Sequence, residues 1–214
     1  MKYDYTRNID ILIQRYPALA PVRDAVAEAI DTLIEVYRNG GKLLVGGNGG
    51  SCADAEHIAG ELLKGFLSKR PLSETEKQAF SAFGSEGEQL GECLQKGLPC
   101  VVLSAHTGFL TAFGNDVNFE YAYAQQLFAQ GRAGDAVIGI TCSGNAANIY
   151  HAFIAAKATG IKTILLTGAG NGRCRALADI VIAVPETEVY KIQELHLPVY
   201  HLLCMAVEEA IYGS

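Results

Sequence analysis

A glycine-rich segment and the helix predicted to follow it hold the first residues that could bind a ligand. The apolar run 42–45 predicts a buried strand, and four glycines come directly after it: Gly46, Gly47, Gly49 and Gly50. Glycine lets the backbone turn sharply and approach a ligand closely. Ser51 and Asp54 stand where a helix would begin, and either could cap it. Because the free N–H groups and dipole of a helix start favour anions, the segment is a candidate phosphate site.

Two common nucleotide-binding patterns are missing from this segment. No Lys follows the glycines in the GK[ST] position of a P-loop. The residues after Gly47-Asn48-Gly49 do not complete the dinucleotide pattern GxGxxG. A strand–glycine–helix turn also occurs without any ligand, so the segment alone does not decide its role.

The predicted helix after the glycines carries an ionisable pair. His57 and Glu61 are four residues apart, so their side chains share one helix face. Such a pair is often only a solvated ion pair, and the alternative is that both groups serve a site near the glycine turn.

Two further polar groups follow predicted strands. Thr141-Cys142-Ser143-Gly144-Asn145 offers hydroxyls and a new helix start, which suits a phosphate, although such a turn could simply cap the helix. Asn115 and Asp116 follow an earlier strand, and taken alone they could be a surface cap. In a parallel sheet, ligands bind beyond the carboxyl ends of the strands, which is where these groups are expected.

The last predicted helix, 188–212, is apolar almost all round and is expected to be buried. Four polar residues interrupt that surface and need partners: Gln193, Glu194, His196 and His201. Gln193 and Glu194 are eight and seven residues before His201, so spacing alone cannot choose which of them shares its face. Pro198 should kink the helix, because it cannot donate to the carbonyl of Glu194.

Strands and helices alternate along the rest of the chain. Apolar runs predict strands at 42–45, 100–104, 135–141, 161–167 and 179–184, with helices at about 108–130, 145–159, 172–178 and 188–212. This alternation indicates an α/β fold, a three-layer sandwich with a central five-stranded parallel sheet.

Two regions flank or interrupt this pattern. Residues 4–38 predict an N-terminal helix pair divided by Pro17 and Pro21, whose apolar face packs on the sheet or on another subunit. Residues 67–99 form the least regular stretch and predict two short surface helices with Ser73 and Ser85 as caps. This insertion could be a solvated excursion or could carry a function of its own.

Composition excludes several classes of protein. A net charge of −6 argues against a nucleic-acid surface, and no apolar run is long enough to span a bilayer. The N-terminus lacks the apolar stretch of a secretory signal. The six cysteines are scattered without a CxxC pair, so neither a disulfide framework nor a zinc ribbon is indicated. A reducing cytoplasm is the expected location.

Four motifs, in this order, resemble those of the phosphoheptose isomerases of the sugar isomerase (SIS) superfamily. They are GGNGGSCADAEHIAGEL, FGNDVNF, ITCSGNAAN and IQELHLPVYH, and the similarity runs from about residue 40 onward. The resemblance implies a single flavodoxin-like SIS domain over 1–214, with the N-terminal helix pair at 1–40 and the insertion at 67–99. It also implies a homo-oligomer, a tetramer, while charge and composition predict no membrane and no direct nucleic-acid partner.

The resemblance also implies roles for particular residues. It implies one zinc ion per subunit, held by His57, Glu61, Gln193 and His201, with Glu61 as base and His201 as acid. Three of these four implied ligands, the two His and the Glu, are ordinary zinc donors, whereas a Gln oxygen is rarer. The implied substrate contacts are Asn48, Gly49, Gly50, Ser51, Glu61, Asn115, Asp116, Thr141, Cys142, Ser143 and Gln193.

The implied reaction is an aldose–ketose isomerisation through an enediol, between sedoheptulose 7-phosphate and D-glycero-D-manno-heptose 7-phosphate. It needs a base beside the carbon that loses a proton and an acid beside the neighbouring oxygen. A metal could polarise the carbonyl. If no reaction occurs at Glu61 and His201, the two could merely form a buried ion pair.

Several positions depart from the family pattern. Ala146 and Cys142 replace a Ser and a Thr of the phosphate loop, Tyr190 replaces a frequent Asp, and an Arg expected after Glu61 is missing although Lys64 is near. These differences leave two alternatives open: an isomerase for another sugar phosphate, and a non-catalytic SIS protein that binds a phosphosugar or a protein partner. The presence of both Glu61 and His201 favours an enzyme.

Overall fold

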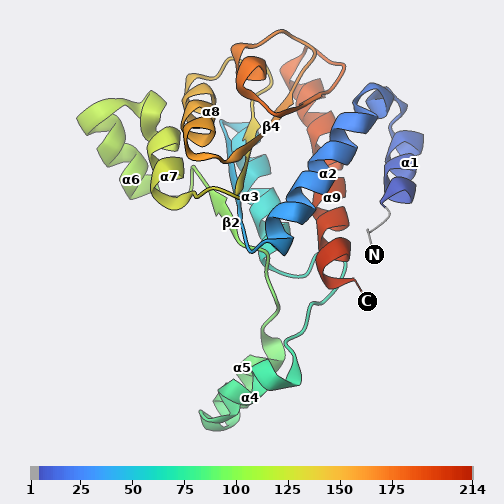
Figure 1. Cartoon of the computed structure of the whole chain (residues 1–214), viewed down its shortest axis with the longest axis vertical. Coiled ribbons are helices and arrows are strands. Elements are labelled where there is room, and N and C mark those ends of the chain that lie inside the picture. Colours follow the sequence, from blue (N-terminus) through green and yellow to red (C-terminus); the bar gives the residue numbers. More distant parts are fainter. Residues whose placement is uncertain (1–4, 214) are drawn as a thin grey trace.

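The sheet at the centre of the molecule is built from five parallel strands in the order β2-β1-β3-β4-β5 (Figure 1). The computed structural model describes residues 5–213. The strands are β1 (Leu43–Gly47), β2 (Cys100–Val102), β3 (Ala136–Ile140), β4 (Lys162–Thr167) and β5 (Ile180–Ala183). Each predicted strand is present, and the predicted α/β class with a central parallel sheet is confirmed.

Helices cover both faces of the sheet, because its strands are apolar on both sides. Leu43 and Val45 point into a core shared with α2 (Arg23–Arg38), α3 (Gly50–Leu63) and α9 (Val189–Tyr212). Leu44, between them, points into a second core with α7 (Ala122–Gln130) and α8 (Ala147–Thr159). Figure 1 shows the two helical layers on opposite sides of the strands.

The N-terminal helix pair divides at the prolines, as predicted. Helix α1 (Thr6–Arg15) is followed by a 3₁₀ segment, Pro17–Val22, and then by α2. Helix α1 packs against α9, and α2 packs against α9 and β5. The pair therefore belongs to the helical layer on one face of the sheet. The prediction that residue 4 is helical concerns a position outside the described residues.

The predicted helix at 108–130 is wrong as a continuous element. It is divided into α6 (Thr107–Phe113), a π turn (Gly114–Asn118), a 3₁₀ turn (Phe119–Tyr121) and α7. Asn118 has extended backbone angles and its side chain accepts a hydrogen bond from the Glu120 N–H, so it starts a new turn rather than continuing the old one. The predicted helix at 172–178 is only a 3₁₀ turn, Arg173–Leu177.

The insertion forms an arm that projects from the body (Figure 1). The arm, residues 67–99, holds α4 (Glu74–Ser81) and α5 (Gly84–Cys93), which pack against each other. Ser73 caps α4 in a capping box with Glu76, as predicted. Ser85 does not cap α5, because that helix already begins at Gly84 and Phe83 holds the cap position.

A buried ion pair fixes the arm to the body. Arg70 donates to the Glu208 carboxylate over 2.7 Å and to the Leu62 carbonyl, also over 2.7 Å. The same carboxylate accepts the backbone N–H groups of residues 66–68. Burial alone would raise the pKa of Glu208, but these N–H groups and Arg70 lower it. The pair thus joins the ends of α3 and α9 to the first residues of the arm.

None of the helices within residues 5–213 combines the length and apolar character needed to cross a bilayer.

Candidate functional site

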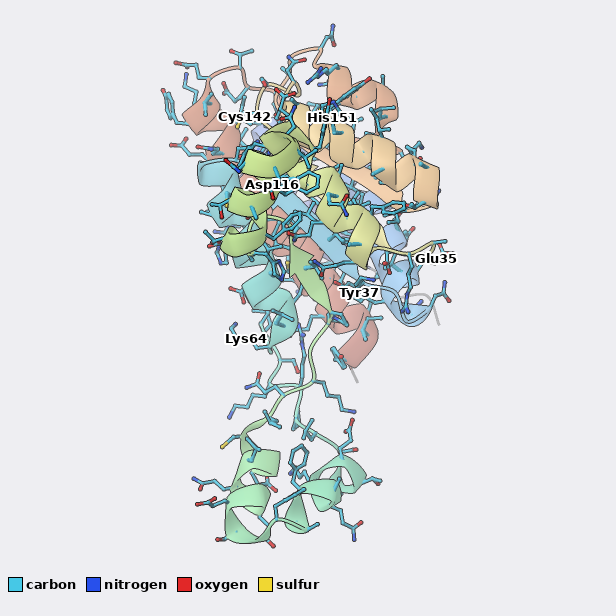
Figure 2. All side chains as sticks on the ribbon, turned by 90° about the vertical axis from the view of Figure 1, so that its left-hand side faces the viewer. Glu35, Tyr37, Lys64, Asp116, Cys142 and His151 are labelled. Carbon is cyan, nitrogen blue, oxygen red and sulfur yellow. The ribbon has the colours of Figure 1, made fainter. Side chains whose placement is uncertain are left out.

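The strand order reverses between β1 and β3, because β2 is added on one side of β1 and β3 on the other. Open parallel sheets bind ligands at such a reversal. The glycine turn follows β1, and the loop 141–145 follows β3. Both therefore lie at the carboxyl edge of adjacent strands. Figure 2 shows Cys142 at the end of the body far from the arm, and Lys64 near the start of the arm. Helix α3 runs between these two regions.

The glycine turn begins α3 without a side-chain cap. Gly49 occupies the cap position with φ +56°, a backbone conformation that suits glycine, so the predicted caps Ser51 and Asp54 are wrong. Ser51 is buried, with its Oγ 4.0 Å from the Cys142 sulfur, and Asp54 accepts a hydrogen bond from Tyr200. Both side chains are directed to other elements rather than back to the helix start.

The turn and the second loop are tied together by two amides. Asn48 and Asn148 exchange reciprocal hydrogen bonds of 2.9 and 2.8 Å. Asn148 is buried in the first turn of α8. The sequence did not indicate a role for Asn148, although this residue lies within the ITCSGNAAN motif, because the hydroxyl groups of that motif were the expected phosphate contacts. The pair holds the two anion-binding candidates side by side.

Loop 141–145 presents polar groups beside the start of α8. Thr141 is buried and Ser143 is exposed, with its Oγ accepting the Asn145 N–H over 3.2 Å. Asn145 in turn accepts the Arg173 N–H over 3.0 Å. Burial raises the pKa of Cys142, so its thiol stays neutral and can act only as a weak hydrogen-bonding group.

Two histidines and a carboxylate meet further along α3. His57 Nε2 lies 3.2 Å from Glu61 Oε1 and 3.4 Å from His201 Nε2. Lys64 Nζ lies 3.0 Å from the other Glu61 oxygen, Oε2. These three predicted site residues, one pair on α3 and one residue on α9, are therefore brought together. Glu61 forms an ion pair with Lys64, and among the described residues no ion pair joins Glu61 to His201, so the alternative of an ion pair between those two is not what the structure contains.

Tyr200 and Asp54 support this group, and sequence reasoning did not assign them. Tyr200 Oη lies 3.0 Å from His57 Nδ1 and donates to Asp54 Oδ1 over 3.2 Å. Asp54 precedes His57 by three residues, so helical spacing could have indicated it. Tyr200 sits in an apolar run and gave no comparable signal.

The structure distinguishes Gln193 from Glu194. A Cβ atom built on Gly50 would lie 2.6 Å from Gln193 Nε2, so the Gln193 amide lies over the glycine turn. Glu194 is exposed. Among the residues that the structure describes, no hydrogen bond links Gln193 to His57, Glu61 or His201. The four expected zinc ligands are thus divided between a group of three and one amide beside Gly50.

Asn115 and Asp116 lie in the π turn, and both are exposed. Asn115 donates to Asp116 over 2.9 Å. Within residues 5–213, no hydrogen bond or ion pair joins these two residues to the glycine turn or to loop 141–145. Their expected contact with substrate stays a prediction.

His201 also faces a hollow between α1 and α9. This cavity of about 200 Å³ is lined by mostly apolar side chains, including Ile11, Phe66 and Leu197. A larger cavity of about 680 Å³ is lined only by residues 74–92 of the arm, so it is separate from the glycine turn and from the group around His57.

The donor atoms around His57 have the chemistry of a zinc site. Zinc bonds of about 2.0–2.1 Å to imidazole and carboxylate place tetrahedral ligand atoms about 3.3 Å apart. The separations of 3.2 and 3.4 Å fall at that value. Across residues 5–213, no group of three or more His, Cys, Asp or Glu side chains is already arranged around a common metal position, and Glu61 and His201 each contact His57 instead. By residue type, two imidazoles and a carboxylate are ordinary zinc donors, so the set is chemically compatible with that metal.

Sequence comparisons identify close relatives over most of the chain. The phosphoheptose isomerase of Aneurinibacillus thermoaerophilus is 42% identical over 181 residues, which are 85% of this chain and 79% of that protein. The phosphoheptose isomerase of Roseiflexus sp. is 36% identical over 205 residues, 96% of this chain and 90% of that protein. No family model matches the sequence.

Solved structures of similar fold include two with the same description. A phosphoheptose isomerase from Francisella tularensis has a TM-score of 0.74 and 30% identity, and covers 96% of this chain and 95% of that one. The phosphoheptose isomerase from Neisseria gonorrhoeae has a TM-score of 0.73 and 29% identity, with the same coverage. The sugar isomerase domain of an RpiR transcription factor from Sphaerobacter thermophilus, with a TM-score of 0.54 and 17% identity, shares the fold alone.

Proposed function

Since this chain belongs to the phosphoheptose isomerase family and is an isomerase of phosphorylated sugars, we propose that it interconverts sedoheptulose 7-phosphate and D-glycero-D-manno-heptose 7-phosphate, with Glu61 as base and His201 as acid. The observation that carries the assignment of residues is the group formed by His57, Glu61 and His201. Two of its contacts are 3.2 and 3.4 Å long, and it lies on the helix that follows the glycine turn.

The reaction moves protons at two adjacent carbons and their oxygens, in two stages. In the direction from ketose to aldose, the Glu61 carboxylate takes a proton from C1 while the His201 imidazole gives one to the carbonyl oxygen on C2. The product is an enediol. Return of a proton to C2 and loss of the proton from the C1 oxygen give the aldehyde, so the reaction moves protons without an external oxidant. Glu61 and His201 both lie beside His57 and differ in type, which suits one to accept a proton and the other to donate one.

Zinc is the metal that we assign to this site, with His57, Glu61 and His201 as its ligands and Gln193 joining them by a movement of its side chain. When bound, zinc would polarise the substrate carbonyl and stabilise negative charge on the neighbouring oxygen. Glu61 cannot be a free base while it holds the metal, so it changes role during turnover. The Lys64 ammonium, 3.0 Å from Glu61, supplies a positive charge beside the carboxylate.

The phosphate end of the substrate is assigned to the edge between β1 and β3. Loop 141–145 supplies the Thr141 and Ser143 hydroxyls, and the glycine turn supplies the N–H groups at the start of α3. The Asn48–Asn148 pair keeps both anion-binding segments at one place. Ala146 offers no hydroxyl, so this loop binds phosphate with one side-chain group fewer than the family pattern.

A homotetramer in the cytoplasm completes the assignment. Ile11 on α1 and Leu197 on α9 are 44% and 41% exposed and line the hollow beside His201, so another copy would bury apolar surface next to the site. All six cysteines are unpaired, as in a reducing compartment. Light scattering at micromolar concentration should give about four times the mass of the 22.8 kDa chain, and a stable monomer would contradict this assignment.

A panel of phosphosugars tests the proposed reaction. The purified protein is incubated with sedoheptulose 7-phosphate, with other ketose phosphates, and with sedoheptulose lacking the phosphate, while its metal content is measured. We expect turnover of the heptulose phosphate and little of the unphosphorylated sugar. Efficient isomerisation of a different sugar phosphate in preference to the heptulose would overturn the substrate assignment.

A further inference from the structure

The hydrogen bonds around Tyr200 fix where the His57 ring carries its hydrogen. The Tyr200 hydroxyl has one hydrogen, which it donates to Asp54 Oδ1 over 3.2 Å. Its 3.0 Å contact with His57 Nδ1 must therefore use a hydrogen from the ring nitrogen. A neutral imidazole with its hydrogen on Nδ1 leaves a lone pair on Nε2. The chain Asp54–Tyr200–His57 thus selects one of the two tautomers.

The lone pair on His57 Nε2 faces Glu61, the proposed catalytic base. His57 Nε2 lies 3.2 Å from a Glu61 oxygen, which has no hydrogen to give when the carboxylate is ionised. The contact sets a lone pair against a negative charge, and a cation or a proton between them relieves the repulsion. The tautomer selected by Tyr200 is the one that can accept a metal ion at Nε2.

The two supporting groups are suited to a fixed role. Tyr200 is 1% exposed and belongs to the core cluster between α9 and the sheet, so its ring cannot easily turn away. Of the two Asp54 oxygens, Oδ1 accepts the hydrogen bond from Tyr200, and Oδ2 is buried without a partner among the described residues.

We propose that Tyr200 and Asp54 are positioning residues that hold His57 with its hydrogen on Nδ1 and so prepare its Nε2 to bind zinc. This inference rests on the proposed function, because it takes the group around His57 as the metal site. It concerns the support of that site rather than its ligands. Neither residue touches the substrate in this account.

The test compares Tyr200→Phe with the matched control Tyr37→Phe. Both changes remove one hydroxyl from a buried tyrosine, and Tyr37 donates to the Pro99 carbonyl instead of meeting His57. Zinc affinity is measured by competition with a chelator. The hydrogen position on His57 is read from nitrogen NMR of metal-free protein labelled at histidine, with His57 assigned by substitution. Asp54→Ala serves as a second variant, because it removes the acceptor of the Tyr200 hydroxyl and leaves the tyrosine itself unchanged.

We expect Tyr200→Phe and Asp54→Ala to weaken zinc binding by about 10–100-fold, the range for loss of a group that orients a metal ligand, and Tyr37→Phe to change it less than about twofold. We also expect His57 to carry its hydrogen on Nδ1 in the wild type and to lose that preference in Tyr200→Phe. Unchanged affinity and an unchanged His57 tautomer in both variants would overturn the proposal. If the wild type binds no zinc, the metal assignment fails, while the NMR measurement on metal-free protein still decides the role of Tyr200.

Discussion

Gly50 shows how a single missing side chain can shape the site. It is the first residue of α3, and a Cβ atom added there would lie only 2.6 Å from Nε2 of the Gln193 amide. The flexible end of Gln193 could move aside, so the conflict is local. Gly50 therefore serves the placement of Gln193 more than the stability of the helix.

The change Gly50→Ala should displace the Gln193 amide from the glycine turn. We expect kcat/KM for the sugar phosphate to fall by about tenfold or more, the scale of one lost hydrogen bond to a charged group, while the free energy of unfolding changes by less than about 1 kcal/mol. Steady-state kinetics and urea unfolding measure the two effects.

Gly60→Ala is the control for this prediction, because it adds a Cβ atom to the same helix with no atom within 4 Å. It should leave turnover unchanged and raise the free energy of unfolding by about 0.5–1 kcal/mol. Equal kinetics for the two variants would remove Gln193 from the site.

The sequence predicted some of these residues because helical spacing reports which side chains share a face. His57 and Glu61 meet as their separation of four predicts. Spacing could not separate Gln193 from Glu194, since residues seven and eight before His201 face nearly the same way. Tyr200 was missed because its ring is a core residue and only its hydroxyl reaches His57. Such mixed roles require the three-dimensional arrangement.

Helix α9 contains a buried histidine that links stability to pH. His196 is 0% exposed, its Nε2 lies 3.3 Å from the Thr167 carbonyl, and its Nδ1 has no partner among the described residues. Burial lowers the pKa of His196 from 6.5 to about 4. The folded protein therefore keeps the ring neutral where the unfolded chain would already bind a proton.

The sign of the pH effect follows from these two pKa values. Above pH 6.5 the ring is neutral in both states, and it has no effect on stability. Below that pH the unfolded chain takes up the proton first, so the free energy of unfolding falls until the pH reaches about 4. Between about pH 7.5 and about pH 5, we expect His196 to account for a loss of about 2 kcal/mol.

Urea unfolding at these two pH values measures this contribution. The change in the free energy of unfolding between them is compared in wild type and in His196→Leu. His106→Gln is the control, because His106 is exposed and its loss should leave the pH dependence as it is in the wild type. If His196→Leu retains the whole pH dependence, the histidine does not cause it.

Helices and strands could be predicted from the sequence where a single residue pattern continued along the whole segment. The strands were predicted because each is a nearly continuous apolar run, which a strand covered on both faces requires. The region 108–130 was not, because Gly114 and Asn118 interrupt a stretch whose composition otherwise suits a helix. Ser85 was taken as a cap from residue type, whereas the backbone had already turned at Gly84.

At the scale of the whole molecule, the arm is nearly independent of the body. Helix α4 has no buried residue, and the two helices pack mainly on each other. Pro71 and Gln95 pair as an antiparallel bridge at the base of the arm. The ion pair of Arg70 with Glu208 lies on the body side of that bridge. The body should therefore fold without α4 and α5.

We expect replacement of residues 72–94 by a short Gly-Asn turn to lower the midpoint of thermal unfolding by less than about 4 °C, because about 1 kcal/mol at most is lost. Calorimetry on the shortened chain measures this. A matched variant, Glu208→Gln, should destabilise the protein by about 3–5 kcal/mol, since it leaves Arg70 buried without its charged partner. A larger loss from the excision than from Glu208→Gln would show that the arm is part of the core.

The alternation of strands and helices predicted the architecture of the body, because it leaves few ways to cover a parallel sheet. The projection of the arm could not be predicted in that way. Phe83, which would be a core residue by type, is 78% exposed at the end of the arm. Apolar character decides burial only where other elements are close enough to cover the side chain.

The most direct test of the catalytic assignment is the turnover of folded Glu61→Gln. This change keeps the volume of the side chain and removes the carboxylate that takes the proton from C1. Glu56→Gln, at an exposed position of the same helix, is the control and should keep wild-type turnover. We expect Glu61→Gln to remain folded by circular dichroism and to lose isomerase activity by several orders of magnitude. A folded Glu61→Gln protein that isomerises the sugar phosphate at a near-normal rate would contradict the account.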